Sequence, residues 1–275
     1  MSLVLLPRFL RYKLSGMKLI RVAVFILSFS IVILSAAAQS DLEKQAAAAS
    51  ERLIQLHRNW TKISAPGASI EAKEVFRSGA SGPDLVVKYH FYVKGLPQDK
   101  LYESMNWAIN QTGPQTTMEG ISIGKDGLLM CAGRAPEQCG DPFKKDDPIE
   151  FTFLPAKGEP YRFGLAASDA PDVRITTVIV PDPIRAKDKG CSLEAIQLLP
   201  GFALAYVEGN GFQPNSQVSF DSQSFNEKHT AKAKTDDNGI LAFAMLPFVA
   251  GHKNGTTHLG AVGNCSPSLS FDWGK

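Results

Sequence analysis

The sequence lacks most of the motifs that mark an enzyme or a nucleic-acid-binding protein. It contains no C-x-x-C pair, no H-E-x-x-H helix signature and no glycine-rich phosphate loop. These absences exclude the usual patterns of thiol oxidoreductases, zinc proteases and nucleotide-binding folds. It also lacks a long run or stripe of lysine and arginine, which is the electrostatic signature of nucleic-acid binding. We therefore expect no cofactor, no metal and no nucleic-acid partner.

Acidic residues are absent from the first 38 positions. The basic residues there are Arg8, Arg11, Lys13, Lys18 and Arg21. An apolar run from Val22 to Leu34 follows them, and small residues from Ser35 to Ala38 follow the run. This order is typical of an export signal peptide, which we place at residues 1–38. Met17 is an alternative start.

The apolar run is shorter than the roughly 20 residues that a membrane-spanning helix needs. We therefore predict cleavage rather than an uncleaved anchor, with membrane contact only if the segment is retained. No cysteine follows the run directly, which argues against a lipoprotein. Because residues 1–38 carry only positive charge, the remaining chain is mildly acidic. The predicted localisation is secreted or periplasmic.

Four cysteines follow the predicted signal peptide: Cys131, Cys139, Cys191 and Cys265. An even number in an exported chain predicts two disulfides. Of the three possible pairings we choose Cys131–Cys139 and Cys191–Cys265, because each pair then stays within one predicted domain. The gaps do not match the short C-x₂₋₄-C spacing of a zinc site.

One helix is predicted, over residues 40–63. Ser40 followed by Glu43 has the spacing of a capping box. Apolar residues then recur at steps of four and three: Leu42, Ala46, Ala49, Leu53, Leu56, Trp60 and Ile63. This pattern favours an amphipathic helix that docks on the neighbouring domain. The alternative is a stalk or dimerisation helix.

After the helix the pattern changes to the period of two that β-strands have. Val87, Tyr89, Phe91 and Val93 alternate with more polar positions, which predicts a strand with one buried face. The next strand is predicted from Leu101 to Ile109, with Met105 and Trp107 on its apolar face. Further strands are expected at 117–123, 127–132, 149–154, 161–168 and 173–180.

A polar break from Pro181 to Gly190 separates this region, 66–182, from a second one at 189–275. In the second region strands are expected at 192–199, 202–209, 217–222, 229–235, 240–246, 256–262 and 268–273. The stretches Lys125 to Gly127 and Asp237 to Gly239 are predicted hairpin turns.

The two regions echo each other. Tyr92 to Gly95 reads Tyr-Val-Lys-Gly, and Tyr206 to Gly209 reads Tyr-Val-Glu-Gly. Gly127 and Gly239 follow at similar offsets, each behind an acidic or amide residue. This similarity predicts two copies of one β-sandwich.

The run from Gly209 to Phe220, with Gly211, Phe212 and Pro214, resembles the start of an IPT/TIG-type bacterial immunoglobulin-like domain. The resemblance covers about residues 190–275 and, more weakly, 68–182. It implies sandwiches in an extracellular protein, used for binding or spacing. The predicted fold class is therefore mainly β: two tandem Ig-like β-sandwich domains preceded by a short amphipathic helix.

Candidate site residues are few. Tyr92 and Tyr102 fall on the polar faces of their predicted strands, which suggests a possible binding surface for a sugar or peptide. His252 and His258 could meet as metal ligands, although surface histidines are the simpler interpretation. The pair Asp236-Asp237 is best explained as part of a turn, and the pair Asp146-Asp147 as part of a solvated loop, rather than as calcium ligands or glycosidase carboxylates.

These observations favour a non-catalytic exported protein, an envelope or extracellular module that binds an unknown protein or glycan. Two alternatives stay open. One is a secreted hydrolase with a site between the domains, which would require converging His, Asp or Glu residues in a deep cleft. The other is a structural spacer that oligomerises through the 40–63 helix.

Overall fold

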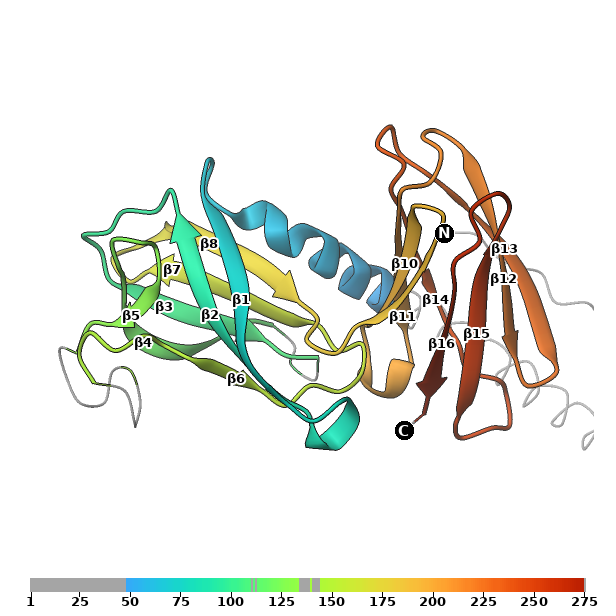
Figure 1. Ribbon diagram of the computed structural model, residues 1–275, viewed down its shortest axis with the longest axis horizontal. Coiled ribbons are helices and arrows are strands. Elements are labelled where there is room, and N and C mark those ends of the chain that lie inside the picture. The colour runs from blue at the N-terminus through green and yellow to red at the C-terminus, as the bar shows by residue number, and fades with distance from the viewer. Residues whose placement is uncertain (1–47, 110, 112, 134–138, 140–143, 275) are drawn as a thin grey trace, which may run out of the picture. The chain divides into compact units, whose positions relative to one another are not determined.

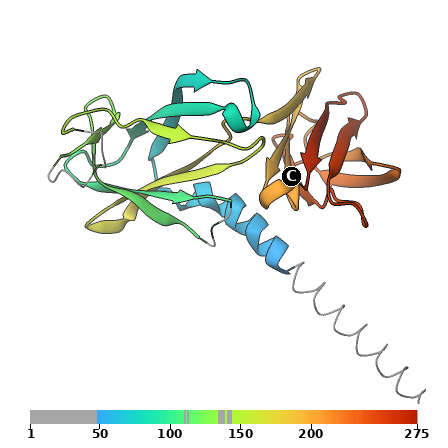
Figure 2. The same cartoon turned by 90° about the horizontal axis from the view of Figure 1, so that it is seen from below.

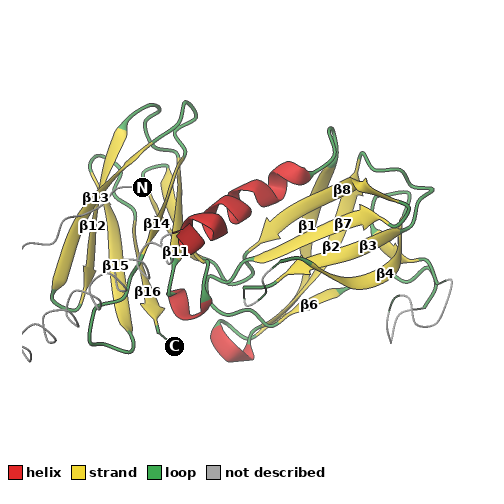
Figure 3. Cartoon of the chain, turned by 180° about the vertical axis from the view of Figure 1, so that it is seen from behind, coloured by secondary structure: helices red, strands yellow, loops and turns green. Residues whose placement is uncertain are grey.

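The computed structural model describes residues 48–109, 111, 113–133, 139 and 144–274. The predicted signal peptide and the start of the predicted helix lie outside the described residues. An α-helix occupies residues 48–60, and antiparallel strands make up most of the rest (Figures 1 and 3). The chain divides between Arg52 and Leu53 into two units, and all the described strands lie in the second unit, Leu53–Lys275. The mainly β class with one short preceding helix is confirmed.

The first pair of sheets follows a 3₁₀ turn, η1 (Thr61–Ile63). One sheet has the order β1 (Ser69–Ser78), β2 (Val86–Lys94) and β6 (Phe151–Phe153). The other has the order β5 (Leu129–Cys131), β4 (Gln115–Ile123), β3 (Tyr102–Trp107), β7 (Tyr161–Ala167) and β8 (Ala170–Ile179). A short 3₁₀ turn, η2 (Gly82–Asp84), precedes β2. One apolar core, which includes Phe91, Tyr102 and Leu165, lies between the two sheets.

The alternation predicted for β2 is confirmed. Val87, Tyr89, Phe91 and Val93 are buried, while the residues between them are only partly buried. Phe91 stacks on Phe163 of β7 with ring centroids 4.1 Å apart. The period of two therefore arises because one face of β2 packs against the opposite sheet.

The face predicted for the next strand is wrong. β3 alternates regularly and pairs with β7 without a register shift, so its two faces are grouped as predicted but take the opposite sides. The irregular pairing around Ser104 places the extra residues on β4. Tyr102 and Ser104 point into the core and are fully buried. Trp107 faces the opposite side, where its ring lies 5.8 Å from that of Trp60.

The second pair of sheets contains the remaining strands. One sheet has the order β14 (Leu241–Met245), β11 (Ala205–Asn210), β10 (Cys191–Gln197) and β9 (Ile184–Asp188). The other has the order β13 (Glu227–Lys234), β12 (Gln217–Ser224), β15 (Gly255–Val262) and β16 (Ser268–Trp273). These strands are coloured gold to dark red in Figure 2. Their shared core includes Leu193, Phe220 and Phe271.

Three local predictions in this region need correction. The polar break contains β9, which pairs with β10. The strand expected from 202 begins at Ala205, because η3 (Pro200–Phe202) forms a 3₁₀ turn before it. Gly239 does sit in a turn with φ of 74°, but β13 and β14 belong to different sheets, so this turn is a crossover and not a hairpin.

The two sheet pairs share one topology. The orders β1-β2-β6 and β4-β3-β7-β8 in the first pair match β10-β11-β14 and β13-β12-β15-β16 in the second. The first pair adds β5 and the second adds β9. The echo of Tyr92–Gly95 by Tyr206–Gly209 falls on the equivalent strands β2 and β11. This match supports the expectation of two copies of one sandwich.

The helix joins the outer faces of two sheets. Trp60 Nε1 donates to the carbonyl oxygens of Phe163 (3.2 Å) and Thr177 (2.9 Å), on β7 and β8. Leu53 and Ile54 pack instead against a separate apolar cluster on β10 and β11, which includes Ile196 and Tyr206. Leu53, Ile54 and Trp60 therefore pack against strands of this same chain.

Candidate functional site

The two disulfides of the structure join Cys131 to Cys139 and Cys191 to Cys265. Their Cα atoms lie 5.8 and 6.1 Å apart, within the usual range for a disulfide. These are the pairs expected from the sequence. They indicate an oxidising environment. No helix among the described residues is both long and apolar enough to cross a membrane.

The two candidate tyrosines do not form one binding surface. Tyr102 is fully buried, and its hydroxyl donates to the carbonyl oxygen of Pro97 (2.6 Å). Burial raises the pKa of Tyr102 to about 12. Tyr92 lies on β2, in the other sheet, where the Lys73 ammonium lies 4.3 Å from its ring centre. The expectation of an exposed Tyr102 failed because both faces of β3 are covered: the Tyr102 face packs in the core, and the Trp107 face lies against Trp60 of the helix.

The candidate metal and carboxylate residues have local structural partners. Among the described residues no group of three metal-ligating side chains comes together. The ring of His252 stacks on Phe225 (3.9 Å), and His258 Nδ1 lies 2.7 Å from Ser270 Oγ. Asp147 and Asp236 accept backbone N–H groups two to four residues away, which is the behaviour of turn residues.

Residues 120–124 read Gly-Ile-Ser-Ile-Gly, which matches the G-x-S-x-G motif of serine hydrolases. In those enzymes the serine stands on a sharp turn from strand to helix. Here Ser122 lies inside β4, paired with Met130 of β5, and its hydroxyl donates to the Met130 carbonyl oxygen (3.3 Å). The motif is therefore a strand segment and not a nucleophile elbow.

Two buried ionisable groups, His57 and Arg162, lie at the contact between the helix and β7. Arg162 of β7 is buried, stacks over Trp107 (4.6 Å) and donates from Nε to Nδ1 of His57 (3.3 Å). Burial, together with the positive charge of Arg162, lowers the pKa of His57 to about 3. Since Nδ1 accepts these bonds, the proton of the neutral ring sits on Nε2. The cluster fixes the helix on the sheet.

A neighbouring cavity of about 360 Å³ contains the acidic pair Glu194 and Glu208. The two face each other across β10 and β11. Arg185 binds Glu194 through Nε (2.8 Å) and Nη2 (3.1 Å). Burial raises the pKa of Glu208, and the charge of Glu194 adds to this effect. The pair thus places the Arg185-bound Glu194 beside Glu208, whose carboxyl group is more readily protonated than usual.

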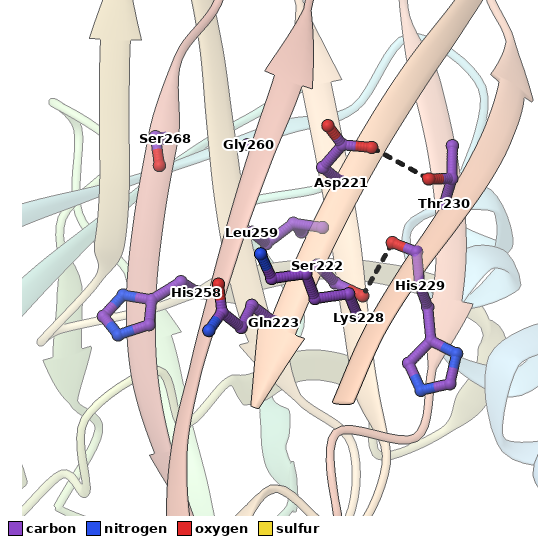
Figure 4. Close-up of a pocket in the computed structure, with 10 residues that line it drawn as sticks. All are labelled: Asp221, Ser222, Gln223, Lys228, His229, Thr230, His258, Leu259, Gly260 and Ser268. Carbon is purple, nitrogen blue, oxygen red and sulfur yellow. Dashed lines mark hydrogen bonds between the residues drawn. The ribbon is translucent and has the colours of Figure 1, made fainter. Parts of the chain in front are cut away.

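The outer face of the β13-β12-β15-β16 sheet is a polar surface that is open to solvent. A groove of about 450 Å³ crosses it at Gly260, which leaves room between Asp221, Thr230 and Ser268 (Figure 4). Thr230 Oγ1 donates to Asp221 Oδ1 (3.0 Å). The imidazoles of His229 and His258 lie on opposite sides of the groove. The groove can therefore bind through hydrogen bonds, but its titratable groups do not converge on one point.

Exposed apolar side chains border this sheet at one end. Phe225 in the β12–β13 turn is 45% exposed, and Leu246 and Phe248 after β14 are 58% and 52% exposed. Leu246 and Phe248 line a small hollow together with Ser224 and Glu227, the residues that flank the turn. We call Phe225, Leu246 and Phe248 the apolar loop patch. Sequence reasoning missed it, although a phenylalanine in a two-residue turn was a usable signal.

Phe225 also has an unusual backbone conformation. Its φ is 50°, in the left-handed region that hairpin turns normally fill with glycine, asparagine or aspartate. An L-residue there costs roughly 1–2 kcal/mol. A large apolar side chain that is both exposed and strained points to a function outside the folded chain.

The chain matches no protein-family model and no curated protein. Its function is therefore inferred from the burial, contacts and charges of its own residues.

Proposed function

We propose that this chain is a non-catalytic exported protein that binds a protein partner of the cell envelope through the apolar loop patch. The observation that carries the proposal is Phe225, which is 45% exposed and has a positive φ, in a turn whose flanking residues line a hollow with Leu246 and Phe248. The adjoining groove around Asp221 and Thr230 supplies hydrogen-bonding groups beside this apolar surface. An apolar centre with a polar rim is the usual anatomy of a protein-binding surface.

The N-terminal export pattern and the disulfides support an envelope or extracellular location for this module. We also propose that the second sheet pair is an IPT/TIG-like domain. In support, the resembling segment from Gly209 to Phe220 connects β11 to β12 across the two sheets. Gly211 has a φ of 78° and Phe212 is buried, as a tight glycine–aromatic turn requires.

The test is co-sedimentation of the purified protein with envelopes from its own source, before and after protease treatment of those envelopes. We expect pelleting with untreated envelopes and its loss after treatment. Phe225→Asn should abolish pelleting without lowering the melting temperature by more than a few degrees. Asparagine tolerates a positive φ, so relief of strain partly offsets the lost ring contacts with His252 and Trp273.

The matched control is Leu154→Asn, which makes a similar apolar-to-amide change at a side chain that is 68% exposed. Leu154 lies outside the apolar loop patch, so this variant should pellet like the parent. Equal pelleting of the Phe225→Asn variant would refute the assigned surface. Pelleting that survives protease would indicate a glycan partner instead.

A second candidate function is the hydrolase alternative, and Glu194 with Glu208 favours it. Two facing carboxyl groups, one of them with a raised pKa, are also found in retaining glycosidases. One observation counts against a hydrolase: the Arg185 guanidinium donates hydrogen bonds to both carboxylate oxygens of Glu194, so this group is not free to act on a substrate. Hydrolysis of a cell-wall polysaccharide that is lost in Glu208→Gln would establish this activity, and no hydrolysis by the parent protein would remove it.

A further inference from the structure

Strand β13 has one free edge. It pairs with β12 over its whole length, from Gln217 opposite Lys234 to Ser224 opposite Glu227, without a register shift. No strand among the described residues pairs with its other edge. All its side chains are exposed except that of Ala233, which is partly buried. A long, regular edge of this kind offers a row of unpaired backbone N–H and C=O groups.

Other long outer strands of this protein have protected edges. β4, the equivalent of β13 in the first sheet pair, carries β5 along its end, with Ile121 to Ile123 paired to Cys131 to Leu129. β1 is interrupted by an irregularity between Glu74 and Phe76. The edge of β8 is covered where the Ala65 backbone N–H donates to Arg174 O (2.7 Å). β13 therefore has no added strand along its outer edge, unlike its counterpart β4.

The lysines of β13 lie on one face. Lys228, Lys232 and Lys234 stand opposite Gln223, Ser219 and Gln217, on the outer face of the sheet. The intervening Ala231 and Ala233 face Phe220 and Val218 of the core. None of the three lysines forms an ion pair with a residue that the structure describes. An added strand would therefore meet positive charge at alternate positions on one face.

We propose that β13 is a docking edge for an extended acidic segment of a partner protein, which adds to the sheet as a further antiparallel or parallel strand. Backbone hydrogen bonds to β13 hold the segment. Aspartate or glutamate at every second position then lies beside the lysine row, and opposite charges in cross-strand positions stabilise the pairing. This inference rests on the proposed binding function, since it names the chemistry of the partner at an adjoining surface.

A second copy of this chain fits the same edge poorly. An antiparallel pair of β13 strands centred on Thr230 places Lys228 opposite Lys232. The pair centred on Ala231 places Lys228 opposite Lys234. Like charges in directly opposed positions destabilise a sheet. The lysine row thus opposes self-association and favours an acidic strand.

The test uses the full-length chain and synthetic eight-residue peptides, with binding measured by fluorescence anisotropy. The first peptide has glutamate at every second position and valine or threonine between. The second has the same composition with its glutamates in one block. We expect the alternating peptide to bind about tenfold more tightly, because only it can place every glutamate on the lysine face.

Two further peptides carry N-methyl groups on alternate backbone nitrogens, one set on the glutamates and the other on the residues between. In a paired strand, successive N–H groups point to opposite sides. One methylated peptide should therefore lose binding and the other should keep it. Equal binding by both methylated peptides would show that only charge attraction operates, and the proposal would be wrong.

A charge-reversal variant, Lys228→Glu with Lys232→Glu and Lys234→Glu, should weaken the alternating peptide at least about tenfold. The matched control reverses Lys94, Lys125 and Lys157, exposed lysines away from β13, and should retain most of the affinity in 0.15 M salt. Unchanged binding by the β13 variant overturns the inference. If the peptides fail while envelope pelleting still depends on Phe225, strand addition is wrong and the proposed function stands; if pelleting fails too, both are wrong.

Discussion

At the scale of single residues, His57 shows how burial sets the acid sensitivity of this protein. The ring is 6% exposed and accepts hydrogen bonds from Arg162, so the folded chain resists its protonation. Its pKa falls from 6.5 to about 3 on folding. The unfolded chain therefore binds a proton between these pH values that the folded chain refuses.

We predict that the free energy of unfolding decreases as the pH falls from about 6.5 toward 3, with a contribution from His57 of up to about 1.4 kcal/mol per pH unit. Urea unfolding at several pH values measures this slope. His57→Gln keeps an acceptor for Arg162 but cannot be protonated, so its slope should be shallower. An identical slope in the variant would assign the acid sensitivity to other groups.

At the scale of elements, Trp60 is the most buried side chain of the described helix. Trp60 is 5% exposed, packs on Trp107 and donates to two backbone carbonyl oxygens. Trp60→Ala should lower the free energy of unfolding by about 3–5 kcal/mol, since it removes buried aromatic surface and leaves a cavity. Leu56→Ala is the control, because Leu56 is 37% exposed and its truncation should cost clearly less. Chemical denaturation of both variants checks the difference.

The elements also show where sequence patterns succeed. The alternation in β2 predicted the strand correctly because a single face of it is buried. In β3 the core covers one face and the helix covers the other, so alternation alone did not show which sides Tyr102 and Trp107 take. β9 was missed because its sequence, Ile184 to Asp188, is short and mostly polar between two prolines and a glycine.

The candidate site was harder to predict than the fold. The cysteine pairs could be chosen from their positions along the chain. The apolar loop patch could not, because Phe225 and Leu246 come from separate loops that only the folded sheets bring near one hollow. The lysine row of β13 was visible as alternate lysines, but its free edge depends on the absence of a pairing strand, which a sequence does not display.

At the scale of the whole molecule, the two disulfides close loops of very different length. Their sequence separations are 8 and 74 residues. Chain entropy assigns them stabilisations of roughly 2.5 and 4.5 kcal/mol. The longer one joins β10 to the connection between β15 and β16, which lie in opposite sheets of the second pair.

We therefore predict that replacing Cys191 and Cys265 with serine lowers the melting temperature more than replacing Cys131 and Cys139. Differential scanning calorimetry of the two double variants measures both effects. Hydrogen exchange adds a spatial check, since amides of β10 and β15 should lose protection only in the first variant. The reverse order of melting temperatures would contradict the loop-entropy argument.

The position of the helix has a consequence during synthesis of the chain on the ribosome. Arg58 binds the Tyr206 hydroxyl, a partner that lies 148 residues further along. A ribosome adds about 5–20 residues per second, so roughly 7–30 s pass between the two. During that time Leu53 and Ile54 have no apolar partner on β11. The apolar side of the helix therefore stays uncovered in the nascent chain until the strand that carries Tyr206 has been synthesised.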